Sequence, residues 1–397
     1  MTQPSAEITR EPIFEFDYIN DDMLKGDVHD GYWKIKESAP PVFWTPANGG
    51  HWVLNSGAAV TQVLLDSKSF TSRYVTIPAT TYTPVVIPTT LDSPEHGPYR
   101  RLLQPFFEPA AIKPLENRII EWTNKLIDDI IDSKQCEFVE GMASRLPVSI
   151  FMELMGLPLE DFDMFRELVV LYFNAQADMV ERGRRADEIM GHMKTLIAER
   201  RKEPRDDLVS KLIAARLVDR PLNQEELMSI CFNMFVGGLD TVVNGMSFGM
   251  LHLARNAPLR QRLIDDPSRS ADLAEELLRR YPVINTRRYV ISDVDVQGVK
   301  MKAGDPVLVP TMMLGWDEAA NACPHLVTLD REGRKHSAFG FGRHVCLGAH
   351  LARLELSVFY NIWFQRIGHF SLTNPDEALE MRAGTVMAIK RLNISWT

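Results

Sequence analysis

Apolar residues recur at three- and four-residue spacing through most of the chain between Pro109 and Asn256. This spacing gathers them on one face of a helix, so it predicts amphipathic helices rather than strands. The helices expected from it cover 116–133, 145–157, 160–180, 186–203 and 231–253. The middle of the chain is therefore predicted to be mainly helical.

Short stretches of β-type sequence predict strands near both ends of the chain. The clearest are 51–55, 294–310 and 392–396. Because these stretches lie far apart in the sequence, we expect a small sheet built from distant segments. That interleaving favours one mixed domain over residues 1–397, mainly α with a minor β region.

The segment Thr71–Asp92 departs from both patterns. It contains Pro78, Pro84 and Pro88, and a proline inside a helix removes a hydrogen bond and clashes with the preceding turn. No regular helix is expected there. An edge strand, a covering loop and the wall of an apolar pocket all fit the segment taken alone.

Composition and charge narrow the classes of partner. The formal net charge of −9 argues against a protein that binds nucleic acid over its whole surface. The 4 cysteines are far apart, which is typical of a reducing cytosol rather than a disulfide framework. We recognise neither a secretory leader nor an apolar run long enough to cross a bilayer. A cytoplasmic protein that binds neither nucleic acid nor membrane is expected, with a monomer as the default.

The strongest candidate for chemistry is Cys346, a lone cysteine directly before a predicted helix. Gly340, Gly342 and Gly348 surround it, and glycine allows tight turns and the close approach of a flat partner. At a helix N-terminus the free N–H groups and the helix dipole stabilise a thiolate. We therefore expect the pKa of Cys346 to be lowered and its sulfur to suit a metal.

Four interpretations of Cys346 remain open at this point. A buried inert thiol would leave the surrounding glycines unexplained. A zinc site could use Cys346 and His350, four residues apart on one helix face, with His344 nearby. His344 could instead act as the base for a nucleophilic cysteine, although no triad signature accompanies it. The fourth is an axial thiolate on haem iron.

A second candidate is the sequence Gly237-Gly238-Leu239-Asp240-Thr241 inside an apolar, helix-like stretch. Glycine in a helix interior costs about 0.5–1 kcal/mol relative to alanine, so two of them need a reason. Close helix packing, with the threonine hydroxyl bonded back to its own helix, is one explanation. A groove for a small molecule beside an acid and an alcohol is the other.

The pattern Phe-x-x-Gly-x-x-x-Cys-x-Gly, from Phe339 to Gly348, resembles the haem-ligand loop of the cytochrome P450 monooxygenases. The resemblance implies the helical prism of that family around a buried haem b. Cys346 would be the axial iron ligand, with Phe339, Gly340 and Gly348 beside the porphyrin. The implied reaction inserts one oxygen atom of dioxygen into a C–H bond.

Other motifs resemble the same family. The Gly237–Thr241 stretch resembles its oxygen-activating helix, in which Gly237 opens a groove for dioxygen while Asp240 and Thr241 deliver protons. Glu276 and Arg279 alone would be an ordinary helix-surface pair. Together with Arg331 they match a Glu-Arg-Arg cluster that supports the fold behind the haem loop.

A haem needs cations for its two propionates, because carboxylates at the edge of an apolar pocket are costly without partners. The family likeness assigns this role to four residues. They are His96, Arg100, Arg288 and His344.

The likeness is to the camphor-hydroxylase branch of bacterial P450s, which implies a partner. Members of that branch take electrons from a [2Fe–2S] ferredoxin with its NADH-dependent reductase. Ferredoxins are acidic, so we expect docking through basic side chains on the Cys346 side. The candidates are Arg100, Arg101, Lys335 and Arg343.

The substrate pocket is where the sequence departs from camphor hydroxylases. Pro84 occupies the place of their ketone-binding tyrosine, Tyr82 is two residues away, and Asn233 replaces an expected apolar residue. Camphor is therefore a doubtful substrate, and a small terpenoid or norisoprenoid that can carry one oxygen is expected. The remaining pocket positions implied by the likeness are Val86, Val236, Gly237, Val283, Ile284, Thr385 and Val386.

Two alternative functions are weighed against monooxygenation. One is a haem-thiolate peroxygenase or isomerase, which usually lacks the acid–alcohol pair found here at Asp240 and Thr241. The other is a non-catalytic haem-binding or zinc-binding protein.

Overall fold

The computed structural model describes residues 10–79, 85–175 and 178–397. Tyr82 and Pro84, two of the residues expected at the substrate pocket, lie outside these ranges. Within them, Thr71–Asp92 forms no helix, as the prolines predict.

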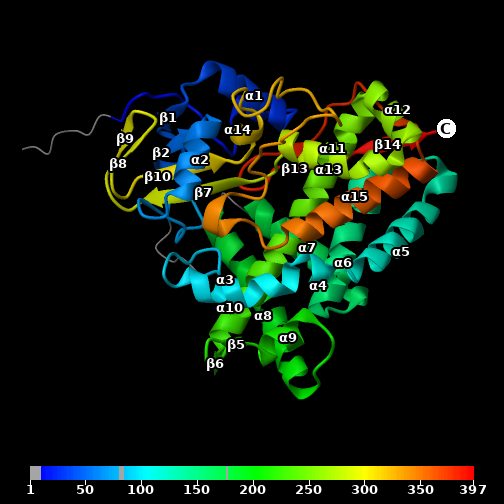
Figure 1. Cartoon of the computed structure of the whole chain (residues 1–397), viewed down its shortest axis with the longest axis horizontal. Coiled ribbons are helices and arrows are strands. Elements are labelled where there is room, and N and C mark those ends of the chain that lie inside the picture. Colours follow the sequence, from blue (N-terminus) through cyan, green and yellow to red (C-terminus); the bar gives the residue numbers. More distant parts are fainter. Residues whose placement is uncertain (1–9, 80–84, 176–177) are drawn as a thin grey trace, which may run out of the picture.

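Helices make up most of the described chain (Figure 1). The bounds of the α-helices are α1 Val28–Ser38, α2 Gly57–Leu65, α3 His96–Leu103, α4 Pro109–Ile112, α5 Leu115–Asp128, α6 Arg145–Met155, α7 Phe162–Asn174, α8 Met179–Lys202, α9 Leu208–Ala214, α10 Gln224–Gly238, α11 Thr241–Arg255, α12 Ala257–Asp265, α13 Ser270–Arg280, α14 Met312–Gly315 and α15 Ala349–Arg366.

The predicted helices of the middle segment are confirmed as α5, α6, α7 and α8, but three of their ends differ: α5 ends at Asp128, α7 ends at Asn174 and α8 already begins at Met179. A further correction concerns the last predicted helix. The apolar stretch 231–253 was expected to be one helix, but α10 ends at Gly238 and α11 begins at Thr241. The break falls at Leu239 and Asp240. Its physical reason is tertiary: the Asp240 side chain is drawn into two buried ion pairs at this point.

The strands are short, and most of them lie toward the two ends of the chain, as predicted, whereas β4, β5 and β6 lie in its middle. Their bounds are β1 Val42–Thr45, β2 His51–Leu54, β3 Phe70–Thr71, β4 Gln135–Glu137, β5 Arg216–Leu217, β6 Arg220–Pro221, β7 Asn285–Val290, β8 Val294–Val296, β9 Val299–Met301, β10 Pro306–Pro310, β11 Phe370–Leu372, β12 Met381–Arg382, β13 Ala388–Ile389 and β14 Asn393–Trp396.

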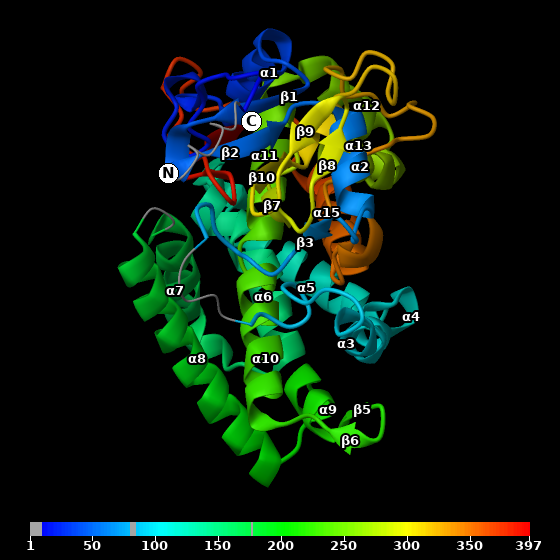
Figure 2. The same cartoon turned by 90° about the vertical axis from the view of Figure 1, so that its left-hand side faces the viewer.

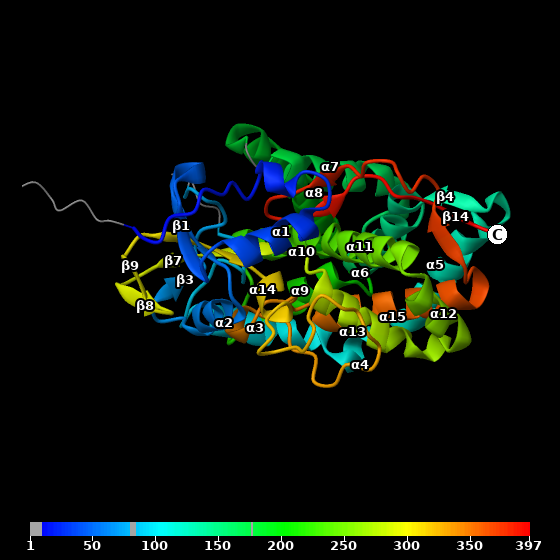
Figure 3. The ribbon, with the colours of Figure 1, turned by 90° about the horizontal axis from the view of Figure 1, so that it is seen from above.

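The main sheet joins segments separated by more than 200 residues. Its five strands have the order β1-β2-β10-β7-β3. The β2–β10 pair is parallel, and the other pairs are antiparallel. Seen from above, this sheet lies at one end of the molecule and α5, α12 and the C-terminus lie at the other (Figure 3).

The helices α10 and α11 run through the centre of the molecule, with α7 and α8 on one side (Figure 2). The stretch Gln224–Arg255 is long and apolar enough to span a membrane by length and composition, but more than half of its most apolar window is buried inside the protein. Trp363, Tyr360 and Phe359 of α15 are fully buried on another side of the core. The central pair is therefore a core element, and the cavity described next lies between it and α15.

Candidate active site

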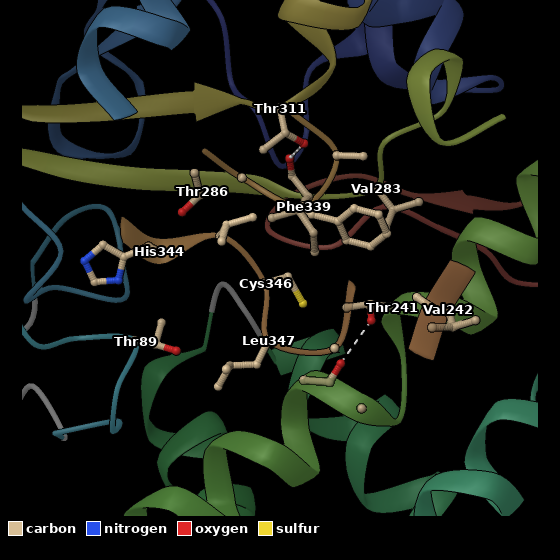
Figure 4. Close-up of a pocket in the computed structure, with 18 of the residues that line it drawn as sticks. Thr89, Thr241, Val242, Val283, Thr286, Thr311, Phe339, His344, Cys346 and Leu347 are labelled. Carbon is tan, nitrogen blue, oxygen red and sulfur yellow. Dashed lines mark hydrogen bonds between the residues drawn. The ribbon is translucent and has the colours of Figure 1, made fainter. Parts of the chain in front are cut away.

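A cavity of about 360 Å³ separates the centre of α10 and α11 from the loop before α15. Figure 4 shows Cys346 directed into it, with Phe339, Leu347 and Val283 around it and Thr241 on the opposite wall. Most of the lining is apolar. The lining residues used below are Pro88, Thr89, His96, Arg100, Asn233, Met234, Gly237, Thr241, Val283, Ile284, Thr286, Arg288, Thr311, Phe339, Gly340, His344, Cys346, Gly348 and Glu355.

The loop that carries Cys346 is fixed by its backbone. The N–H of Cys346 donates to the carbonyl of Phe339 at 2.8 Å, and the N–H of Gly340 donates to that of Ser337 at 2.8 Å. Gly340 and Gly342 have φ of 75° and 68°, which side chains rarely adopt without strain. A Cβ at Gly342 would also lie 3.0 Å from the carbonyl oxygen of Leu64. Two of the three glycines around the cysteine are therefore required by the turn itself.

The expected lowering of the Cys346 pKa is wrong for the protein without cofactor. Burial of the thiol raises its pKa, while the N–H of Gly348 and the charges of Arg100 and Arg353 oppose this. The donors predicted from the helix N-terminus are present, but the loss of hydration outweighs them. A thiolate here needs a positive partner in the cavity.

The charges of Arg100 and Arg288 are gathered with two histidine rings at one edge of the cavity. The rings of His96 and His344 lie 4.4 Å apart between centroids. The pKa of His344 is lowered to about 3 by burial and by the charge of Arg288, followed by His96 and Arg100. Burial lowers the pKa of Arg288 to about 10. The structure thus brings together the four residues to which the family likeness assigns the propionates.

This basic edge lacks an anionic partner within the described chain. Arg100 donates to the carbonyl of Val345, and Arg288 donates to that of Arg287. Neither forms an ion pair with a carboxylate among the described residues. The buried Nε2 of His96 has no hydrogen-bond partner there either. Two carboxylates placed at this edge would satisfy these groups.

On the opposite wall, the two glycines at the end of α10 have different causes. A Cβ at Gly238 would lie 2.4 Å from the ring of Phe151, so close packing explains that glycine. A Cβ at Gly237 would meet no atom within 4 Å, so this glycine leaves an open groove. The Thr241 hydroxyl donates to the carbonyl of Gly237 at 3.0 Å (Figure 4). Close packing therefore accounts for Gly238, and open space accounts for Gly237.

Asp240 lies beside the cavity rather than in it. Its side chain is 2% exposed, and it pairs with Arg166 of α7 and Arg382 of β12, each at 2.9 Å. Arg382 also donates to the Asn174 side chain at 2.8 Å. Sequence reasoning missed both arginines, because an ion pair across 142 residues leaves no local signal. They hold the acid at the α10–α11 break.

Behind the Cys346 loop, the fully buried Glu276 is the centre of a charged cluster. It pairs with Arg279 at 2.9 Å and with Arg331 at 2.7 Å. Arg279 also donates to the carbonyls of Gly315 and Pro324 at 2.7 Å. The surface-pair interpretation of Glu276 and Arg279 is wrong, since both side chains are 0% exposed.

Comparison with known proteins agrees with this geometry. The family model described as cytochrome P450 matches residues 150–268 and 273–396. A probable cytochrome P450 127A1 from Sinorhizobium fredii is 32% identical over 379 residues, covering 94% of this chain and 90% of the relative. Mycinamicin IV hydroxylase/epoxidase from Micromonospora griseorubida is 33% identical over 302 residues, 75% of this chain and 76% of that protein.

Solved structures agree as well. The crystal structure of CYP101J2 matches with a TM-score of 0.89 and 34% identity, covering 100% of both chains. That of cytochrome P450 CYP101C1 matches with a TM-score of 0.86 and 30% identity, covering 97% of both.

The chain belongs to the cytochrome P450 family.

As expected from its motifs, this P450 resembles the camphor-hydroxylase branch of the bacterial enzymes and has their mainly helical fold with a smaller β region. P450s of this kind are monooxygenases that carry haem b. The cavity fits that cofactor on three grounds. It has a cysteine sulfur on one wall, a basic edge whose arginines form no ion pair with any described carboxylate, and at that edge a buried His96 Nε2 that has no hydrogen-bond partner among the described residues.

The zinc interpretation of Cys346 finds no support in the described part of the chain. No group of three or more His, Cys, Asp or Glu side chains is arranged there to hold a metal ion. His350 is exposed and lines a separate hollow with Glu275 and Arg353, away from Cys346. The two histidines that flank the cysteine in sequence therefore diverge, because His344 faces the cavity and His350 does not.

The substrate positions implied by the family likeness divide into two groups. Asn233, Gly237, Val283 and Ile284 line the cavity. Four others lie outside its lining: Val86, Val236, Thr385 and Val386. The sequence missed Thr89 and Glu355, which do line it.

The reasons for this division are visible in the backbone. The N–H of Val86 donates to the Thr90 hydroxyl, and this bond holds the buried valine within its own loop. The carbonyl of Thr385 accepts from the N–H of Asn285 at 3.0 Å, so the C-terminal segment packs behind β7. Glu355 of α15 is 2% exposed, and burial raises its pKa well above the usual range. Burial therefore favours the protonated form of this cavity-lining acid.

Proposed function

We propose that this P450 hydroxylates a small hydrophobic molecule of terpenoid or norisoprenoid type, with camphor a poor substrate. The observation that supports this best is the mainly apolar cavity between Cys346 and the Gly237–Thr241 turn. When bound, haem b activates dioxygen so that one oxygen atom enters a C–H bond of the substrate and the other leaves as water.

The residues that would hold the cofactor follow from the cavity walls. The Cys346 sulfur would bind the iron, and Phe339, Gly340 and Gly348 belong to the loop beside it. A ferric ion bound to the sulfur would favour the thiolate over the thiol. It would so lower the pKa that burial raises. The propionates would be met by His96, Arg100, Arg288 and His344.

Thr241 and Asp240 are proposed to manage protons on the opposite wall. The Thr241 hydroxyl donates to the carbonyl of Gly237, so its oxygen keeps lone pairs for a donor in the cavity. Asp240 is the preceding residue and is held by Arg166 and Arg382. Exchanging either arginine partner for water would connect the carboxylate to solvent, from which it could take up a proton. It could then pass that proton to the Thr241 oxygen while the Thr241 hydroxyl releases its own proton to an acceptor in the cavity.

The apolar walls would position the substrate. Val283 and Ile284 reach the cavity from the segment between α13 and β7, and they can present one C–H bond to the oxidant while excluding bulk water. Orientation of this kind lowers the barrier by supplying the correct geometry in advance. A screen of terpenoid ligands for the substrate-induced spin shift, followed by product analysis, tests the proposal. A full shift with camphor would contradict the substrate assignment.

Electrons are proposed to come from an acidic [2Fe–2S] ferredoxin and its NADH-dependent reductase. Arg101, Lys335 and Arg343 are exposed, whereas Arg100 is half-buried and committed to the Val345 carbonyl. Arg343→Glu should slow reduction by ferredoxin and leave substrate affinity unchanged. The matched control is Lys390→Glu, at an exposed lysine near the C-terminus. Unchanged reduction kinetics in the Arg343 variant would remove this docking site.

The competing reaction, with peroxide as the oxidant or with isomerisation, is not favoured because Asp240 and Thr241 are both present. We also propose that residues 1–397 act as one domain, as a monomer, in the cytoplasm.

A further inference from the structure

The described end of the Thr71–Asp92 loop is fixed to the helix α10 by hydrogen bonds. The Ser229 hydroxyl accepts from the N–H of Ile87 at 2.8 Å and donates to the carbonyl of Val85 at 2.6 Å. The Thr90 hydroxyl accepts from the N–H of Val86 at 2.8 Å. Because its N–H groups and carbonyls are occupied in this way, the loop presents Pro88 and Thr89 to the cavity in a defined orientation.

One helical turn after Ser229, the loop and the helix meet again through side chains. The Thr89 hydroxyl donates to Oδ1 of Asn233 at 3.0 Å. This bond sets the orientation of the amide, since the oxygen faces Thr89 and the Nδ2 group faces away. No hydrogen-bond acceptor for Nδ2 exists among the described residues. Asn233 therefore offers two unused N–H donors on the cavity wall.

The threonine hydroxyls elsewhere in the cavity differ from the Asn233 amide in how they are bonded. Thr241 donates to the carbonyl of Gly237, and Thr311 donates to the carbonyl of Ile284 at 2.7 Å. Thr286 belongs to β7 and lies beside His344 at the basic edge (Figure 4). Among the described residues of the wall formed by α10 and the loop, Thr89 and Asn233 are thus a polar pair that lines the cavity and keeps donors unused.

We infer that the Thr89–Asn233 pair recognises a hydrogen-bond acceptor oxygen, a ketone or ether, on an otherwise hydrophobic substrate. Asn233 donates to that oxygen, and Thr89 acts as a positioning residue that holds the amide. This inference rests on the proposed function for the identity of the reaction. It narrows the substrate class to terpenoids that already carry one acceptor oxygen.

The position of the pair also predicts which end of the substrate reacts. Asn233 lies one turn before Gly237, about 6 Å along the helix axis, and Thr241 lies beyond the break. In the view of Figure 4, Cys346 lies between Thr89 and Thr241. A substrate held by its oxygen at Asn233 would therefore turn its far carbons toward the Cys346 side. The new hydroxyl should enter away from the existing oxygen.

Isothermal titration calorimetry on the haem-loaded ferric protein tests the recognition directly. The probes p-menthane, menthone and menthol share one carbon skeleton and differ in the oxygen. Asn233→Leu should weaken menthone binding about tenfold, the value of one lost hydrogen bond, and leave p-menthane unchanged or bound slightly more tightly. Comparing each ligand with itself across variants cancels its own hydration.

Two further variants separate recognition from general changes in the wall. Thr89→Val should weaken menthone about threefold, because the amide can then rotate, and the Thr89→Val, Asn233→Leu double variant should resemble Asn233→Leu alone. Met234→Leu is a volume-conserving change at the neighbouring cavity residue. It should change the binding affinities of all three ligands by the same factor.

Three results would overturn the inference. One is equal loss of menthone and p-menthane affinity in Asn233→Leu. A second is unchanged menthone affinity in that variant, and a third is a larger loss of menthol than of menthone affinity in that variant, which would mean that the Asn233 oxygen accepts from a ligand hydroxyl. All are binding measurements, so they remain decisive even if no hydroxylated product forms. Conversely, a product from a hydrocarbon substrate alone would uphold monooxygenation and refute the oxygen recognition.

Discussion

The wall that carries Cys346 and the wall that carries Asn233 are built from different kinds of contact. Behind Cys346, backbone hydrogen bonds, positive-φ glycines and the buried Glu276 cluster leave little freedom. On the α10 wall, single side-chain bonds such as Thr89 to Asn233 hold the loop against the helix. The Cys346 side is built to keep a cofactor in place, and the Asn233 side is where substrate choice can change at small cost to folding.

The largest expected difference concerns stability. Glu276→Ala would leave the fully buried guanidinium of Arg279 without its carboxylate, at a cost of about 3–5 kcal/mol in unfolding free energy. Lys125→Ala, which breaks an exposed pair with Asp129, should cost less than about 1 kcal/mol. Urea unfolding of the haem-loaded variants measures both. Similar losses of unfolding free energy in both variants would mean that the Glu276 cluster stabilises the fold no more than an exposed ion pair does.

Glu355 sharpens the comparison, because it is a buried acid on the α15 side without an ion-pair partner in the described chain. Its pKa is raised in the folded state, so the unfolded chain loses its proton at lower pH than the folded one. The unfolding free energy should therefore fall with rising pH above about pH 5, by about 1.4 kcal/mol per unit from this group.

Glu355→Gln provides the measurement. Chemical unfolding of the haem-loaded protein between pH 5 and pH 8 should show a shallower loss of stability in this variant than in the unaltered protein. Identical slopes would mean that Glu355 is charged in the folded state and has found a cation.

The smallest effect in stability, but an informative one, comes from the two adjacent glycines. Gly238→Ala would force its Cβ against the ring of Phe151 and should cost about 1–3 kcal/mol. Gly237→Ala meets open space and should leave stability unchanged or slightly raised, while it fills the groove beside Thr241. Thermal unfolding compares the stability of the two variants. The ratio of product formed to NADH consumed should fall in Gly237→Ala and not in folded Gly238→Ala. A destabilised Gly237→Ala would contradict the open groove.

The same contrast explains what the sequence could reveal. The helices over 116–133 and 186–203 follow from local periodicity, and the Cys346 loop follows from a motif within ten residues. The break at Leu239 and Asp240 could not be predicted, because the apolar pattern continues across it and the arginines that pair with Asp240, Arg166 and Arg382, lie 74 and 142 residues away. The pKa of Cys346 was predicted in the wrong direction because burial is a property of the packed cavity.

Substrate contacts were the least predictable part. The family likeness correctly places Asn233 at the cavity. Thr89 is identified only by its hydrogen bond to Asn233, which lies 144 residues away in the sequence. Val86, which the family likeness implied, packs into its own loop instead. Local chemistry can be inferred from a motif, but a wall formed by two distant segments needs their three-dimensional arrangement.

The central claim is that the Cys346 thiolate binds haem iron in this cavity. The most direct test is the absorption spectrum of the reduced, haem-loaded protein with carbon monoxide, recorded for the unaltered chain and for Cys346→His. The account predicts the red-shifted Soret band of thiolate ligation in the unaltered protein and its loss in the variant. A folded, haem-loaded unaltered protein without that band, or a variant that retains it, would contradict the account.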